Sequence, residues 1–202
     1  MRHSVLRRSQ KTNEIAHCTE RCPPEFEEPC KRLKVCIVSD SHDRAPMLAA
    51  AVAQGKAAGA EAVIHCGDVI GTQTLRPLLA LGLPVHVVHG NNLGDAVSLI
   101  RLCSASGGLI SYYGQDADLM LGGKRVFATH YPHYGCVIDC AGDHELVCCG
   151  HDHVASILTQ PNIKGGNTWL LNPGTVAGLG APATWLLTNL DSLTFDIRNL
   201  DG

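Results

Sequence analysis

Short apolar runs, separated by polar and glycine-rich segments, dominate the hydrophobic pattern of this chain. Five of them have the length and aliphatic content of buried strands: Leu33–Val38, Ala62–Cys66, Val85–His89, Arg125–Thr129 and Glu145–Cys149. None reaches the roughly 18 apolar residues of a membrane span, so we expect no membrane insertion. The pattern predicts strands of an α/β fold.

Helical character falls between these runs. The three clearest predicted helices are Pro46–Ala58, Thr72–Leu81 and Asp95–Ser104. Pro46 suits a first helical turn, and Asp95 suits an N-cap. Pro77 should kink or shorten the second helix, because it lacks a backbone N–H. His133–Gly142 is compatible with a fourth helix.

The second half of the chain contains turn signals. Asp118–Leu121 and Arg125–Thr129 flank Gly122-Gly123-Lys124, which predicts a β-hairpin. From Val154 onward the pattern alternates short strands and turns. The final predicted strands are Thr184–Asn189 and Thr194–Arg198.

Each of the five strand-like runs is followed by polar residues suited to metal binding: Asp40-Ser41-His42, Gly67-Asp68, Gly90-Asn91, His130 and Gly150-His151-Asp152-His153. Ligands of open α/β sheets bind outside the carboxyl ends of the strands, so these motifs can converge. Side chains at i and i+2 of a strand share a face. Asp40 and His42 can therefore chelate one ion, as can His151 and His153 if strand geometry continues past Gly150. Carboxylate, imidazole and amide ligands suit manganese, iron, zinc or nickel.

These motifs resemble the calcineurin-like metallophosphoesterase superfamily, and most closely its small single-domain YfcE-like phosphodiesterase branch. The matching segments are Val-Ser-Asp-Ser-His at 38–42, Ile-His-Cys-Gly-Asp at 64–68, His-Gly-Asn-Asn at 89–92 and Leu-Asn-Pro-Gly-Thr-Val at 171–176. The resemblance covers roughly residues 33–200. It implies an α/β fold of the four-layer α/β/β/α sandwich type, with two metals at the sheet edge.

The resemblance also implies a set of site residues. By motif position, the first metal would be held by Asp40, His42, Asp68 and His153, and the second by a bridging Asp68 with Asn91, His130 and His151. The candidate catalytic residues are Asp68, Asn91, Asn92 and His130. The implied reaction is hydrolysis of a phosphodiester in a small or nucleotide-like substrate. Its nucleophile would be a hydroxide bridging two divalent ions, with Mn²⁺ favoured and Ni²⁺, Fe²⁺ or Zn²⁺ compatible.

Three positions depart from the family pattern. Many members carry a histidine, which can protonate the leaving group, where this chain has Asn92. A neutral amide cannot act as a general acid near pH 7. The close branch usually continues Gly-Asn-x-Asp, whereas this chain has Leu93 and places its acidic residue at Asp95. Tyr131 replaces the glycine of the usual His-Gly-His and should narrow the site.

Several polar residues have a structural alternative to a functional role. Asp40 and Asp95 could cap helices, and the histidines of the motifs could lie on the surface. For His65, His86 and His89, which fall in or beside predicted strands, we favour packing roles or hydrogen bonds to ligands. The role of His133 stays open. The segment Asn172-Pro173-Gly174 is compatible both with a simple turn and with a place beside the metals.

Charge is distributed unevenly along the chain. Residues 1–34 are net basic and residues 35–202 are net acidic, within a formal net charge of −3. The acidic part lacks a basic stripe, so we expect no stable nucleic-acid binding. Residues 1–32 have little apolar periodicity, which predicts a disordered extension before a single domain at 33–202. The alternative for this extension is a zinc site formed by His17, Cys18, Cys22 and Cys30.

The ten cysteines are scattered. Cys36, Cys66, Cys148 and Cys149 fall in predicted strands, which favours buried thiols over disulfides. Free thiols indicate a reducing compartment, so we expect a cytoplasmic protein. The expected partner is a small phosphoester, and homo-oligomerisation is compatible with the sequence. The alternative function is a weakly active or inactive metal-binding interaction scaffold of the same fold.

Overall fold

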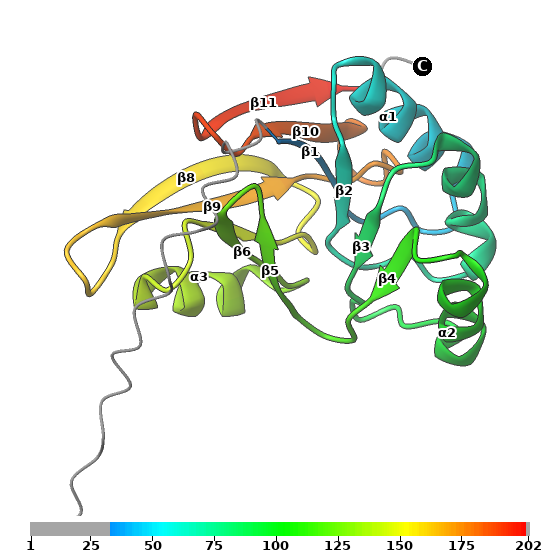
Figure 1. The fold of residues 1–202 in the computed structure, drawn as a ribbon, viewed down its shortest axis with the longest axis horizontal. Helices are drawn as coiled ribbons and strands as arrows, with labels where there is room; N and C mark the ends of the chain where they lie inside the picture. Colours follow the sequence, from blue (N-terminus) through cyan, green and yellow to red (C-terminus); the bar gives the residue numbers. More distant parts are fainter. Residues whose placement is uncertain (1–32, 201–202) are drawn as a thin grey trace, which may run out of the picture.

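A computed structural model describes residues 33–200 as two stacked β-sheets with helices on both outer sides (Figure 1). The predictions for residues 1–32, both the extension and the zinc alternative, lie outside the described residues. None of the helices in residues 33–200 has the length and apolar character that a membrane span requires.

The first sheet has six strands in the order β11-β10-β1-β2-β3-β4. They are β1 (Lys34–Val38), β2 (Ala62–His65), β3 (Val85–Val87), β4 (Ile110–Tyr112), β10 (Thr184–Asn189) and β11 (Thr194–Asn199). Strands β1 to β4 are parallel, and β10 and β11 extend the sheet antiparallel. The carboxyl ends of β1, β2 and β3 therefore meet at one edge.

The second sheet has five strands in the order β5-β6-β7-β9-β8. They are β5 (Ala117–Leu121), β6 (Lys124–Ala128), β7 (Leu146–Cys148), β8 (Ala155–Pro161) and β9 (Asn167–Pro173). Helix α3 (Pro132–Ala141) connects the parallel strands β6 and β7. The loops after these two strands carry His130 and His151.

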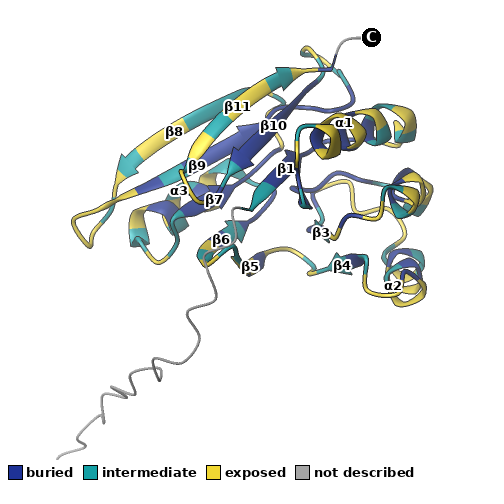
Figure 2. Cartoon of the chain, turned by 45° about the horizontal axis from the view of Figure 1, so that its top comes forward, coloured by how far each residue is buried: buried dark blue, intermediate teal, exposed yellow. Residues whose placement is uncertain are grey.

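Three apolar clusters separate four layers. The first packs one face of the first sheet against α1 (Ala45–Ala57) and α2 (Ala96–Ala105), and it includes Trp185 and Leu48. The second lies between the two sheets and includes Ile37 and Leu171. The third packs the second sheet against α3. Figure 2 shows the buried residues concentrated in the central strands. Full burial of one large aliphatic side chain stabilises the fold by about 1.5–3 kcal/mol. The predicted α/β/β/α sandwich is confirmed.

The predicted helix at Thr72–Leu81 is wrong in type. The chain forms two 3₁₀ segments there, Thr72–Thr74 and Arg76–Leu81. The N–H of Leu75 donates to Thr72 O, and the N–H of Leu78 donates to Leu75 O, each three residues back. Pro77 lies in the first turn of the second segment, where its missing N–H leaves no gap.

Most other local predictions are confirmed within one or two residues. Asp95 caps α2 and accepts a hydrogen bond from the backbone N–H of Ser98. The hairpin joins β5 and β6 through Gly122 and Gly123, both with positive φ, while Lys124 already belongs to the strand. The predicted strands at 85–89, 125–129 and 145–149 each end earlier, so their last residues lie in loops.

The thiol prediction is confirmed for the described residues. All seven cysteines of residues 33–200 are free, and the four predicted in strands are buried. Burial raises the pKa of Cys36 to about 12. A buried thiol of that kind stays protonated and acts as a small apolar side chain.

Candidate metal centre

The five polar motifs meet where the carboxyl ends of strands from both sheets come together, but the backbone is not extended at five of the candidate ligands. Asp40 and His42 have φ values of 53° and 41°, and Asp68 has 55°. His151 and His153 have φ values of 78° and 60°. Left-handed conformations are costly for non-glycine residues and concentrate at functional sites. The expected strand geometry is therefore wrong, and tight turns place these side chains instead.

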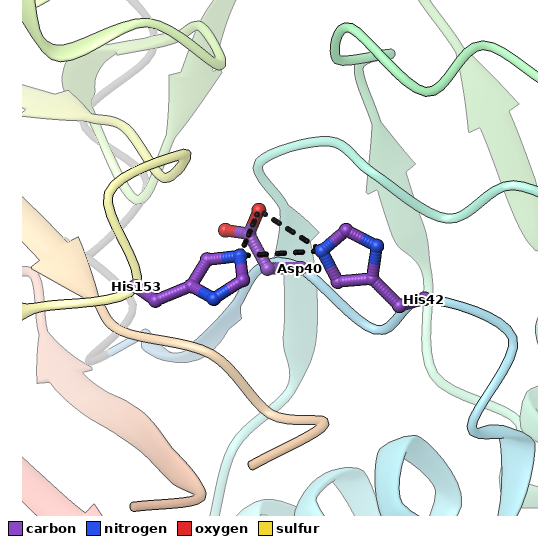
Figure 3. A group of neighbouring side chains, drawn as sticks. All are labelled: Asp40, His42 and His153. Atoms are coloured by element: carbon purple, nitrogen blue, oxygen red, sulfur yellow. Dashed lines mark hydrogen bonds and ion pairs between the residues drawn. The ribbon is translucent and has the colours of Figure 1, made fainter. Parts of the chain in front are cut away.

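One group, the first cluster, consists of Asp40, His42 and His153 (Figure 3). The Nε2 atoms of His42 and His153 lie 3.7 and 3.3 Å from Asp40 Oδ1, and 3.2 Å from each other. Asp40 Oδ1 is buried and accepts no hydrogen bond from the described residues. The Nδ1–H of His153 donates to Leu179 O at 2.7 Å, which leaves Nε2 free to bind a metal.

A second cluster forms around Asn91. Its side-chain Oδ1 lies 3.0 Å from His130 Nε2 and 3.0 Å from His151 Nδ1. The Nδ1–H of the fully buried His130 donates to Cys66 O at 2.8 Å. This bond fixes the ring so that Nε2 faces Asn91. The second cluster thus combines one amide oxygen with two imidazole nitrogens.

Asp68 lies between the two clusters. Its Oδ2 is 3.7 Å from His42 Nε2, and its Oδ1 is 3.6 Å from His130 Nε2. Each carboxylate oxygen also accepts a hydrogen bond from Asn92, the backbone N–H at 2.8 Å and Nδ2 at 2.6 Å. The carboxylate is therefore held with one oxygen toward each cluster.

Two glycines directly before candidate ligands have no room for a side chain. A Cβ atom on Gly90 would collide with Asp68 Oδ1 and lie 2.7 Å from His130 Nε2. A Cβ atom on Gly150 would collide with Ser39 Oγ and lie 2.8 Å from Asp40 Oδ2. Both contacts are shorter than real Cβ atoms show, so only glycine allows the backbone to pass this close to the carboxylates.

All seven predicted ligand residues are brought together, and Asp40 and His42 share a cluster as expected, but His151 and His153 do not. His151 and His153 do not face one point. His153 lies with Asp40 and His42, whereas His151 lies with Asn91. The left-handed backbone at both residues separates their side chains. The family resemblance assigned His153 to the first metal and His151 to the second, and these ligand roles stay predictions.

The donor set fits divalent metal ions. An unpartnered carboxylate oxygen inside a protein is costly, and a bound cation would satisfy it. Asp40 Oδ1 is such an atom: within residues 33–200 it has no hydrogen-bond partner, and it lies 3.7 and 3.3 Å from two imidazole nitrogens. Nitrogen and oxygen donors without thiolate favour first-row divalent ions.

Supporting residues were only partly recognised from the sequence. The sequence identifies Asn92 as a missing acid, but it does not predict the two hydrogen bonds from Asn92 to Asp68. Asn172 is the penultimate residue of β9 rather than part of a simple turn, and its Nδ2 donates to Gly150 O at 2.9 Å and to Asp152 Oδ1 at 2.7 Å. Thr175 Oγ1 donates to Asp40 O at 3.0 Å. The matching family segment at 171–176 was the available signal for both residues.

The remaining histidines lie outside the two clusters. His65 Nε2 lies 2.9 Å from Ser41 Oγ, and burial together with the nearby His130 lowers the pKa of His65 to about 3. It therefore stays neutral. His86 and His89 each bond a tyrosine through Nδ1, Tyr113 and Tyr112 respectively. Within residues 33–200, none of these three histidine side chains is hydrogen-bonded to a predicted ligand.

Comparison with known proteins gives a family for this arrangement. Residues 33–192 match the model of the calcineurin-like phosphoesterase superfamily domain. The chain belongs to the calcineurin-like phosphoesterase superfamily. Within this superfamily, it is 24% identical over 163 residues to Phosphodiesterase MJ0936 of Methanocaldococcus jannaschii, covering 77% of this chain and 92% of that protein.

Solved structures agree on the superfamily's fold. One, described as a novel archaeal phosphodiesterase, superposes with a TM-score of 0.74 at 23% identity, covering 83% of this chain and all of the other. Another, the phosphoesterase Yfce from E. coli, has a TM-score of 0.59 at 18% identity, covering 84% of this chain and all of the other. At such identities the likeness shows the shared fold.

Proposed function

We propose that this superfamily member is a metal-dependent phosphodiesterase acting on a small or nucleotide-like substrate. The observation that carries the proposal is the position of Asp68. Its two oxygens lie 3.7 and 3.6 Å from histidines of different clusters. A carboxylate in this position can contact two ions at once, as two-metal phosphoesterase sites require.

The proposed ligand roles follow the two clusters. Asp40, His42 and His153 would hold one ion, and Asn91, His130 and His151 would hold the other, with Asp68 shared. Mn²⁺ is our first choice, and Ni²⁺, Fe²⁺ or Zn²⁺ suit the same donors. When bound, two divalent ions would supply positive charge for the phosphoryl oxygens and an activated water.

Hydrogen bonds from neighbouring residues hold the candidate ligands in position. Asn92 holds both oxygens of Asp68 through its backbone N–H and its amide. Asn172 and Thr175 hold the turns that carry His151 and Asp40. The residue directly after Asn91 is Asn92 rather than histidine, and the Asn92 amide cannot donate a proton as an acid. This favours phosphodiesters with leaving groups that depart without protonation.

An enzyme is favoured over an interaction scaffold of the same fold. A protein that serves only as an interaction scaffold does not need metal-binding side chains to converge, and substitutions could remove them without loss of function. Here all seven predicted ligand positions converge on two adjacent clusters, with supporting hydrogen bonds behind them. The free thiols of the described region support a reducing compartment such as the cytoplasm.

The direct test joins metal analysis to a substrate comparison. Protein purified without chelator should contain about two divalent ions per chain, the number that such sites hold. It should hydrolyse bis(4-nitrophenyl) phosphate faster than 4-nitrophenyl phosphate. His151→Ala should lower both metal content and rate. His86→Ala is the matched control, because His86 bonds Tyr113 away from the clusters. Full activity in metal-free protein would refute the proposal.

A further inference from the structure

A series of aromatic rings leads away from the candidate metal centre onto α3. The ring of Tyr131 lies edge-on to His130 and tilted steeply to His151, with centroids 5.2 Å apart in both pairs. The centroids of the Tyr131 and Tyr134 rings lie 5.5 Å apart, and those of the Tyr134 and His133 rings lie 4.2 Å apart. Such ring contacts are favourable at these distances. They connect two predicted metal ligands with Tyr134.

Tyr134 also lines a cavity of about 430 Å³ at the start of β5. The other lining residues are Gln115, Asp116, Phe127, Val137 and Ile138. This volume is within the range of small-molecule sites, about 300–1,000 Å³. Tyr134 and Val137 are 45% and 68% exposed, so no described part of the chain covers their apolar surface.

The chemistry of the lining selects a neutral flat ring. None of its residues is Lys or Arg, and Asp116 would repel a second phosphate. Tyr134 and Phe127 offer ring surfaces, on which any nucleobase can stack. The exposed Gln115 supplies both a donor and an acceptor, and Asp116 supplies an acceptor, for the polar edge of a base.

We propose that this cavity binds the nucleobase of a nucleoside phosphodiester whose phosphoryl group lies at the metal centre. The inference rests on the proposed function and names its substrate class. A nucleobase is separated from its 5′-phosphate by one sugar. Tyr134 lines the cavity, and the ring of Tyr131 connects Tyr134 with His130 and His151. The two linkages are of the same kind, one ring in each case.

The test uses two esters with the same leaving group, thymidine 5′-(4-nitrophenyl phosphate) and methyl 4-nitrophenyl phosphate. The ratio of their kcat/KM values isolates the contribution of the nucleoside. Tyr134→Ala in the full chain should lower this ratio about tenfold, the scale of one base–aromatic stack. Tyr134→Phe keeps the ring and should preserve the ratio. Met120→Ala, an exposed position outside the cavity, is the second control.

Binding is measured separately by saturation-transfer NMR from the protein to the base protons of thymidine. We expect transfer in the wild type and its loss in Tyr134→Ala. If the protein hydrolyses neither ester but shows this Tyr134-dependent transfer, the base site is supported and the proposed function is refuted. Hydrolysis of both esters with a ratio unaffected by Tyr134→Ala, and no transfer to thymidine, overturns the base site and leaves the proposed function standing.

Discussion

Replacing Asp68 with asparagine should weaken metal binding and catalysis but leave the stability of the metal-free fold nearly unchanged. The change keeps the shape of the side chain and removes its charge. In the metal-free protein, the carboxylate oxygens of Asp68 and Asp40 belong to one group of ligand atoms that all lie within 4.8 Å of one another. At an effective dielectric constant of about 20, repulsion between two such charges is on the order of 3 kcal/mol. Asp68→Asn removes this repulsion.

The same substitution weakens two hydrogen bonds. Asn92 donates to both oxygens of Asp68, and an asparagine at position 68 presents an NH₂ group to one of those donors. Charge-assisted hydrogen bonds contribute about 1.5–3 kcal/mol. The loss and the relieved repulsion are of similar size, so the metal-free melting temperature should move by only a few degrees.

Metal binding and catalysis should respond very differently. Asp68 is the residue shared by both clusters, so its charge is lost to both ions together. We expect a fall in kcat/KM of at least about 100-fold, equivalent to roughly 2.7 kcal/mol, with fewer ions bound per chain. Asp95→Asn is the matched control, because it removes the same charge while asparagine still caps α2.

The assays are metal content, thermal melting without metal, and kinetics with a saturating divalent ion. Near wild-type metal content and rate in Asp68→Asn would refute the bridging role and leave Asp68 as a turn residue. A large loss of metal-free stability would instead show that the lost hydrogen bonds outweigh the relieved repulsion.

Three further predictions use the same preparations. Chelation should abolish turnover, and Mn²⁺ or Ni²⁺ should restore it; activity that survives exhaustive chelation contradicts this. The rate should depend steeply on the pKa of the leaving group, and Asn92→His should speed the reaction of poor leaving groups within the 10²–10⁴-fold range of general acids. The variant also loses the hydrogen bond from the Asn92 amide to Asp68, which offsets part of this gain. A rate that does not depend on leaving-group pKa, measured where chemistry limits the rate, points to another acid. Deleting residues 1–31 should leave melting temperature and activity nearly unchanged, since that segment lacks apolar periodicity; loss of folding or of a bound zinc would favour the cysteine site.

The sequence predicted the strands and the convergence of the candidate ligands because both depend on local patterns. Aliphatic runs mark β1 and β2, and the polar residues that follow them mark the sheet edge. The backbone at His151 and His153 could not be predicted in this way, since a left-handed turn requires the surrounding tertiary contacts to hold it. The two donors of Asn92 were missed for a similar reason, because they depend on how the loop after β3 returns toward Asp68.

The two clusters draw their candidate ligands from loops that follow strands of both sheets. Asp40 follows β1 in the first sheet, whereas His130 and His153 follow β6 and β7 in the second. Ions held there would act as cross-links between the layers, much as a disulfide joins distant parts of a chain. Because an unfolded chain cannot present such a site, metal affinity would add to global stability, by about 2.7 kcal/mol at a free concentration 100 times Kd. Metal supply would then set the folded fraction of the protein as well as its activity.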